Sequence, residues 1–198
     1  MQTARGASLS DAEPPSSNGV PLPGRRRVGV LALIATTVLA LDLATKVTVV
    51  ARFEGRTPLE LAGSLLTLRV IRNPGAAFGL GVGMTIVFSI VAVGVVVTII
   101  RLAPRLRSLT WAMALGLILG GALGNLVDRV FRAPGPLQGH VVDTVSLFAP
   151  DGRVWPVFNM ADACIVSGGV LLVLLALFGR ELDGTRSGGN KAEEPAGE

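Results

Sequence analysis

The sequence predicts an all-α membrane protein with four transmembrane helices and a small extracytoplasmic β-sheet element. Half of the 198 residues are hydrophobic and only 16% are charged, whereas soluble domains contain about 25% charged residues. Four apolar segments are long enough to cross a bilayer at roughly 1.5 Å of rise per residue. Between the first two of them lies a short stretch with the alternation of a β-strand.

The predicted spans are nearly free of charge. The second and third contain no charged residue, the first contains only Asp42 and Lys46, and the fourth contains only Asp162. The four spans are residues 28–50, 84–100, 110–127 and 157–178. Because their number is even, both termini are predicted to lie on the same side of the membrane.

Basic residues predict which side that is. They precede the first span, occupy the loop between the second and third, and follow the fourth, and such residues favour the cytoplasmic side. They are Arg25, Arg26, Arg27, Arg101, Arg105, Arg107, Arg180, Arg186 and Lys191. The connections 51–83 and 128–156 are therefore predicted to face outward, although they also hold seven arginines.

Three regions are predicted along the chain. Residues 28–180 form one membrane domain, and the polar segments 1–27 and 181–198 are predicted to be disordered cytoplasmic tails. Three arginines before an apolar run resemble a signal peptide, but the run is about 23 residues long and contains Asp42 and Lys46. We therefore expect an uncleaved first span.

Composition argues against several classes of function. The net charge is +4, but the basic residues lie mostly between apolar segments, so nucleic-acid binding is not expected. The single cysteine, Cys164, excludes an internal disulfide and a two-thiol metal site, and is expected to pack as a small apolar residue. The only histidine, His140, is expected to be a loop side chain. The motifs of serine hydrolases, zinc proteases and phosphate-binding loops are absent.

The first outward connection has its own pattern. Residues 64–71 alternate like a strand, with Leu66, Leu68 and Val70 on one side. They run into Asn73-Pro74-Gly75-Ala76-Ala77-Phe78-Gly79, a sequence typical of a turn. We expect a small sheet at the membrane surface, with an ordinary surface loop as the alternative.

Inserting a charged residue at the centre of a membrane helix costs about 2.5 to 3.5 kcal/mol of free energy. Charged residues at that depth therefore indicate a structural or functional role. Asp42 and Lys46 lie four residues apart and can pair on one helical face. Asp42 lies about 21 Å along the helix from Val28, in the outer half of the bilayer. The pair is either a structural ion pair or part of a site.

The third span ends in a row of small residues followed by polar ones. Glycines recur every four residues and predict a ridge on which another helix packs closely. These are Gly116, Gly120 and Gly124. Asn125, Asp128 and Arg129 then emerge at the outer end of the span. They either belong to a site or cap the helix terminus, where a cation is favoured.

Two carboxylates are predicted to meet near the outer face. Asp143 lies between apolar pairs just outside the third span, and Asp162 opens the fourth only 19 residues later (162 − 143). Two like charges in a low dielectric tend to share one proton, so one acid serves as base and the other as acid. Such a dyad can activate water for attack on an amide, as in aspartic proteases. The sequence leaves open which acid keeps the proton.

With these motifs in view, the chain resembles the lipoprotein signal peptidases, the type II signal peptidases of bacteria. The resemblance covers about residues 28–178 and rests on five motifs in the order of the family. They are Asp42-Leu43-Ala44-Thr45-Lys46, Asn73-Pro74-Gly75-Ala76-Ala77-Phe78-Gly79, Gly124-Asn125-Leu126-Val127-Asp128-Arg129, Val141-Val142-Asp143 and Phe158-Asn159-Met160-Ala161-Asp162.

The resemblance implies a membrane aspartyl endopeptidase that cuts prolipoprotein signal peptides just before the lipid-modified cysteine, with Asp143 and Asp162 as the catalytic dyad. It implies a mobile flap in 51–83 and part of 129–156. Thr144 departs from the family, in which an aromatic residue is common there. The residues implied to bind substrate or shape the site are Asp42, Lys46, Asn73, Gly75, Phe78, Asn125, Asp128, Arg129 and Asn159.

The resemblance further implies a monomer in the bacterial cytoplasmic membrane, with lipid-modified prolipoproteins and membrane lipids as partners and with no metal or organic cofactor. Two other classes remain as alternatives. A small proton- or ion-coupled transporter would place its polar residues at the bilayer midplane and show repeat symmetry. An assembly protein would use the glycine ridge to pack a partner, and its acids would be incidental.

Overall fold

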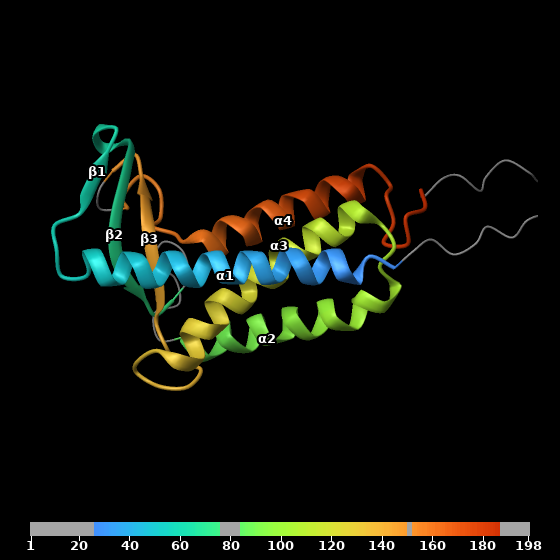
Figure 1. Ribbon diagram of the computed structural model, residues 1–198, viewed down its shortest axis with the longest axis horizontal. Helices are drawn as coiled ribbons and strands as arrows, with labels where there is room; N and C mark the ends of the chain where they lie inside the picture. The colour runs from blue at the N-terminus through green and yellow to red at the C-terminus, as the bar shows by residue number, and fades with distance from the viewer. Residues whose placement is uncertain (1–25, 76–83, 150–151, 187–198) are drawn as a thin grey trace, which may run out of the picture.

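The computed structural model describes residues 26–75, 84–149 and 152–186. Four helices lie alongside one another, and a small sheet lies across one end of the bundle (Figure 1). All four are long and apolar enough to cross a membrane, which confirms the predicted fold class. The helices are α1 (Val28–Phe53), α2 (Thr85–Leu102), α3 (Leu109–Phe131) and α4 (Met160–Leu177).

Helix boundaries differ from the predicted spans at the sheet end. α1 continues to Phe53, and α3 continues to Phe131, so that Asp128 and Arg129 are helical and do not belong to the loop. Hydropathy marks where a helix leaves lipid, whereas the helix itself continues as long as its backbone bonds do.

The fourth helix starts later than the predicted span. It begins at Met160, because the Asn159 side chain accepts a hydrogen bond from the backbone of Asp162, and the Asp162 side chain accepts one from the backbone of Asn159. This reciprocal cap fixes the first turn of α4.

The predicted glycine ridge of α3 packs against α1. A Cβ atom on Gly120 would lie 2.6 Å from Val38 Cβ and 2.7 Å from the carbonyl oxygen of Ala35. One on Gly124 would overlap the carboxylate of Asp42. On another side of α3, Gly121 gives the same close approach to α4. α3 therefore packs closely against both α1 and α4, and it is the most buried of the four spans.

The sheet has three antiparallel strands in the order β1, β2, β3. Its middle strand starts two residues later than predicted, because residues 63–65 form a 3-10 turn. An irregularity between Leu68 and Ile71 shifts the register, so Ile71, and not Val70, shares a side with Leu66 and Leu68. The strands are β1 (Leu59–Leu61), β2 (Leu66–Asn73) and β3 (Val141–Leu147).

The start of α1 and the end of α4 lie at the end of the bundle opposite the sheet (Figure 1). Part of the predicted C-terminal tail, residues 181–186, contacts the bundle there. The carbonyl oxygen of Leu182 accepts hydrogen bonds from the backbone of Arg107 and Ser108, both 3.1 Å. Trp111 Nε1 donates to the Arg180 carbonyl at 2.9 Å. Residues 1–25 and 187–198 of the predicted tails lie outside the described residues.

Candidate active site

Asp143 and Asp162 come together at the sheet end of the bundle. Asp143 lies in β3, and Asp162 lies in the first turn of α4. The segment before α4 pairs with β3, since Phe158 exchanges backbone hydrogen bonds of 2.8 and 2.9 Å with Val145. This pairing carries the start of α4 to the strand that holds Asp143.

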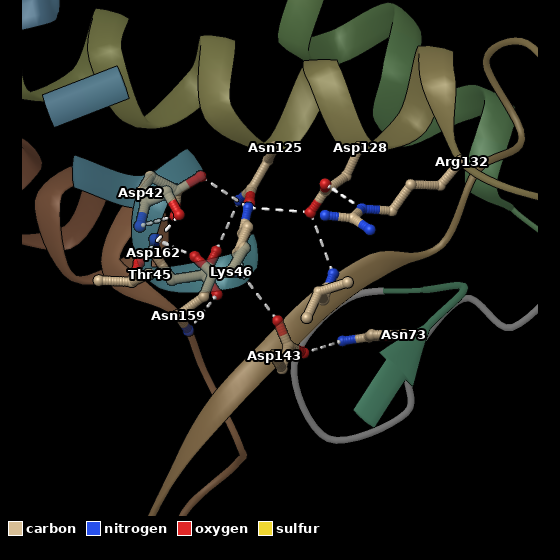
Figure 2. Close-up of polar contacts among 12 residues, drawn as sticks. Asp42, Thr45, Lys46, Asn73, Asn125, Asp128, Arg132, Asp143, Asn159 and Asp162 are labelled. Carbon is tan, nitrogen blue, oxygen red and sulfur yellow. Dashed lines mark hydrogen bonds and ion pairs between the residues drawn. The ribbon is translucent and has the colours of Figure 1, made fainter. Parts of the chain in front are cut away.

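Asn159 joins the two carboxylates (Figure 2). Its side-chain nitrogen donates to Asp143 Oδ1 at 2.9 Å, and its backbone nitrogen donates to Asp162 Oδ2 at 3.2 Å. Asn73 Nδ2 donates to Asp143 Oδ2, and Asn125 Nδ2 donates to Asp162 Oδ1, both at 2.8 Å. Each of the four carboxylate oxygens therefore accepts one N–H donor, and both acids are held in place.

The electrostatic setting of Asp143 favours a bound proton. The residue is 2% exposed. Burial, and secondarily the nearby carboxylate of Asp162, raises the pKa of Asp143 from 3.8 to about 7, against the opposing effect of its two amide hydrogen bonds. Near neutral pH, Asp143 therefore spends a substantial share of the time as a neutral acid.

Both acids open into a cavity of about 560 Å³. Its polar end is formed by the two aspartates with Asn73, Asn125 and Arg129, and its other walls are mainly apolar. The remaining lining residues are Gly75, Val141, Leu147, Trp155, Pro156, Val157, Phe158, Ala163, Ile165, Val166 and Ser167. The apolar wall reaches the surface of α4, where Val166 is 65% exposed.

A buried charged cluster lies beside the dyad. Lys46 Nζ lies 2.8 Å from Asp42 Oδ2 and 3.0 Å from Asp128 Oδ2, and it donates to Asn125 Oδ1 at 3.0 Å. Asp42 Oδ1 also accepts from the backbone of Ala161 at 3.0 Å. The predicted pair of Asp42 and Lys46 is thus an ion pair that also contacts a residue of the site.

The second acid of this cluster, Asp128, is tied to the sheet. Asp128 Oδ2 accepts a hydrogen bond of 3.1 Å from the backbone of Val142, the neighbour of Asp143. Its other oxygen pairs with Arg132. The cluster therefore joins α1, α3, α4 and β3 around the two catalytic candidates.

Arg129 lies in the last turn of α3 and lines the cavity. Its Nη2 donates to the carbonyl of Gly75 at 3.3 Å, and its guanidinium lies 5.6 Å from the ring centroid of Phe88. Gly75 in turn donates from its backbone to Asn73 Oδ1 at 2.9 Å. Phe78 and the other residues of 76–83, the end of the connection in which a flap is predicted, lie outside the described residues.

The apolar wall was missed by the sequence prediction. Trp155, Val157, Ile165 and Val166 line the cavity, but apolar residues in a membrane protein carry no signal that separates a substrate wall from a lipid-facing surface. Trp155 does not stand out either, because it shares the connection 128–156 with Phe131, Phe148 and several aliphatic residues. Among the described residues, no group of three or more His, Cys, Asp or Glu side chains is placed to hold a metal ion.

Residues 34–178 match the family model of signal peptidase (SPase) II. The chain belongs to the signal peptidase II family. The chain is 54% identical over 179 residues to a lipoprotein signal peptidase of Rhodococcus jostii, covering 89% of this chain and 87% of that protein. It is 52% identical over 164 residues to one of Streptomyces griseus, covering 82% and 81%.

A solved structure of a bacterial membrane enzyme, determined by the in meso method at 1.9 Å, has the same fold as this signal peptidase II chain. The TM-score is 0.65 at 28% identity, with 79% of this chain and 97% of that chain covered. The family and the four apolar helices together make the chain a multi-pass membrane peptidase. The transporter and assembly alternatives give way to this assignment.

Proposed function

We propose that the protein removes signal peptides from lipid-modified prolipoproteins by hydrolysis of the bond before the diacylglyceryl-cysteine, with Asp143 and Asp162 as catalytic residues. One observation carries the proposal. Asn159 donates a hydrogen bond to each carboxylate, within a cavity that is polar at the dyad and apolar along α4. The names of the relatives in Rhodococcus jostii and Streptomyces griseus support the substrate class.

In the proposed mechanism, Asp162 is the base and Asp143 is the acid. Asp162 takes a proton from a water molecule, and the oxygen of this water attacks the scissile carbonyl carbon. At the same time Asp143 gives its proton to the carbonyl oxygen. The gem-diol intermediate then collapses: Asp143 takes back one hydroxyl proton, the C–N bond breaks, and the proton held by Asp162 passes to the leaving nitrogen. The raised pKa of Asp143 and the position of Asp162 at a helix N-terminus support this assignment.

The remaining site residues have proposed supporting roles. Asn73, Asn125 and Asn159 hold the acids, and Arg129 with Gly75 forms the polar wall next to the substrate backbone. The exposed apolar side of the cavity fits acyl chains that remain in the lipid while the peptide bond enters the site. No step of this mechanism calls for a metal or an organic cofactor.

We also propose the orientation and the domain organisation. The sheet end faces outward and both termini are cytoplasmic in the bacterial inner membrane, because the segments 1–27, 101–107 and 180–198 carry ten lysines and arginines, against seven in the two connections at the sheet end. Residues 28–180 act as one monomeric membrane domain. The basic residues described at the end opposite the sheet are Arg26, Arg27, Arg101, Arg105, Arg107, Arg180 and Arg186.

The test replaces each acid by its neutral isostere. Purified Asp143→Asn and Asp162→Asn variants, incubated with a lipid-modified precursor and followed by mass spectrometry, should lose cleavage by at least roughly a thousandfold. Asp183→Asn, an exposed acid at the opposite end of the bundle, is the matched control and should cleave normally. Near-normal cleavage by either site variant would remove the dyad from the mechanism.

A further inference from the structure

The side-chain amides of Asn73, Asn125 and Asn159 each donate from nitrogen to a carboxylate of the dyad. Neighbouring groups must fix this orientation of each amide. An asparagine amide has an acceptor end and a donor end, and it can turn over unless a neighbour selects one of them. A group that only donates hydrogen bonds selects the oxygen. The orientation of each amide can therefore be traced to the donor that faces its oxygen.

Two of the three amides are anchored by the backbone. The oxygen of Asn73 faces the backbone N–H of Gly75 at 2.9 Å, and the oxygen of Asn159 faces the backbone N–H of Asp162 at 2.9 Å. Backbone N–H groups cannot accept, so both NH₂ groups must point away from them, and both reach Asp143. These anchors come with the fold itself.

Asn125 is anchored by a side chain. Its oxygen accepts from Lys46 Nζ at 3.0 Å, and its nitrogen donates to Asp162 Oδ1 at 2.8 Å (Figure 2). The Asn159 amide adds a weaker contact of 3.2 Å to the same oxygen. A lysine ammonium has three donors and no acceptor. The ammonium of Lys46 is therefore surrounded by three acceptors, with Asp42 and Asp128 as ion-pair partners and Asn125 as its hydrogen-bond acceptor.

We propose that Lys46 is a positioning residue of the peptidase: its ammonium fixes the amide of Asn125 so that the N–H group, and not the oxygen, faces Asp162. This inference rests on the proposed function. A pure ion-pair role does not explain the third contact, because Asn125 is neutral. The ion-pair partners also have other donors, the backbone of Ala161 for Asp42 and Arg132 for Asp128.

The position of Lys46 separates this role from substrate binding. Lys46 is 0% exposed and is not among the described residues that line the cavity, whereas Asn125 is. Without the ammonium, the amide of Asn125 can turn its oxygen toward the carboxylate of Asp162, where two acceptors repel each other. The base then loses a hydrogen bond and its fixed direction, while no side chain is removed from the lining of the cavity.

The first test compares two long cations of the same cluster. Lys46→Met keeps the length of the side chain and removes its donors; kcat should fall roughly 10- to 100-fold, with KM within about twofold of wild type. Arg132→Met is the matched control, because the contacts described for Arg132 are to Asp128. Its kcat should fall much less than that of Lys46→Met, because no contact described for Arg132 reaches Asn125. Equal losses of kcat in the two variants would contradict the proposal.

The second test asks whether Lys46 acts through Asn125. The double variant Lys46→Met with Asn125→Ala should be no slower than Asn125→Ala alone, since the amide that Lys46 orients is already gone. A loss equal to the product of the two single losses would show that Lys46 acts elsewhere and would overturn the inference. Wild-type enzyme is measured in the same assay, and its failure to cleave the precursor would contradict the proposed function instead.

A further pair of variants covers the case in which Lys46→Met does not fold. Asp42→Asn keeps an acceptor for Ala161 and leaves the contact of Lys46 with Asn125 in place. Asp42→Asn combined with Lys46→Met removes both charges of one ion pair together. The combined variant should have a kcat roughly 10-fold or more below that of Asp42→Asn. Equal kcat values in these two folded variants would overturn the inference.

Discussion

At the scale of single residues, the environment of Asp143 favours its protonated form. It is buried in β3, it accepts hydrogen bonds from two amides, and another carboxylate stands nearby. Burial makes its ionised form costly, and the amide donors only partly offset that cost. This balance keeps a carboxylic acid protonated at a pH where an exposed aspartate would be fully ionised.

The pH dependence of cleavage follows from this residue. Because the pKa of Asp143 is raised to about 7, kcat should be steady just below that pH. It should fall roughly tenfold for each unit well above it, as the acid loses its proton. Stopped assays on a lipid-modified precursor between pH 5 and 9 measure this, with membrane integrity checked at each pH. A rate that keeps rising to pH 9 would contradict the assignment of Asp143 as the acid.

Asp143 should also make the free energy of unfolding depend on pH. Folded Asp143 binds its proton more tightly than the unfolded chain does, so its contribution to the free energy of unfolding falls as pH rises from about 4 to about 7. Asp143→Asn should therefore raise the melting temperature in detergent more at pH 8 than at pH 5. A difference that is the same at both pH values would count against the raised pKa.

Several site residues were predictable one by one, while their contacts were not. Polar residues are few at membrane depth, so Asp42, Asp162 and Asn125 stand out in the sequence. The pairing of Asp42 with Lys46 follows from their spacing along one helix. The contacts of Lys46 with Asp128 and Asn125 depend on how α1 and α3 are placed against each other, which helical spacing does not specify.

At the scale of elements, the close contact of α1 and α3 holds the charged cluster together. The glycine ridge lets the two backbones approach until the carboxylate of Asp42 lies against Gly124. Lys46 reaches Asn125 and Asp128 only at that separation. A larger residue on the ridge would push the helices apart and separate donors from acceptors.

Gly120→Leu should therefore destabilise the protein by about 3 kcal/mol or more and strongly reduce cleavage. A Cβ there would lie 2.7 Å from the carbonyl oxygen of Ala35, so the backbone itself must shift. Gly94→Leu on α2 is the control, because a Cβ at that glycine meets nothing within 4 Å. Thermal unfolding in detergent and precursor cleavage measure both variants. Comparable effects in the two would show that the ridge is not what holds α1 against α3.

At the scale of the whole molecule, the bundle has two chemically different ends. The sheet and both aspartates lie at one end, and the start of α1 and the end of α4 lie at the other (Figure 1). In the full sequence, ten lysines and arginines fall in the segments 1–27, 101–107 and 180–198, against seven in the connections 51–83 and 128–156 at the sheet end. We expect the second end to face the cytoplasm, because positive residues favour that side.

Thiol labelling can test this orientation. In a Cys164→Ala background, which lacks cysteine, Glu60→Cys places a thiol on the exposed strand β1 and Asp183→Cys places one near the opposite end. A membrane-impermeant maleimide added to intact spheroplasts should label position 60 and leave position 183 unlabelled until the membrane is opened. Labelling of position 183 alone in intact spheroplasts would indicate the opposite orientation, with the sheet end in the cytoplasm.

The order of residues by itself determined the four apolar spans, the strand in the first connection and the two acids at one end of the bundle. These depend on hydropathy and on local periodicity, which are properties of short stretches of chain. The tertiary structure decided that Asn159 contacts both carboxylates, that Lys46 faces the oxygen of Asn125, and that Leu182 accepts hydrogen bonds from the segment just before α3. Those contacts join segments distant in sequence, and they exist only because packing brings the helices and the sheet within hydrogen-bonding distance.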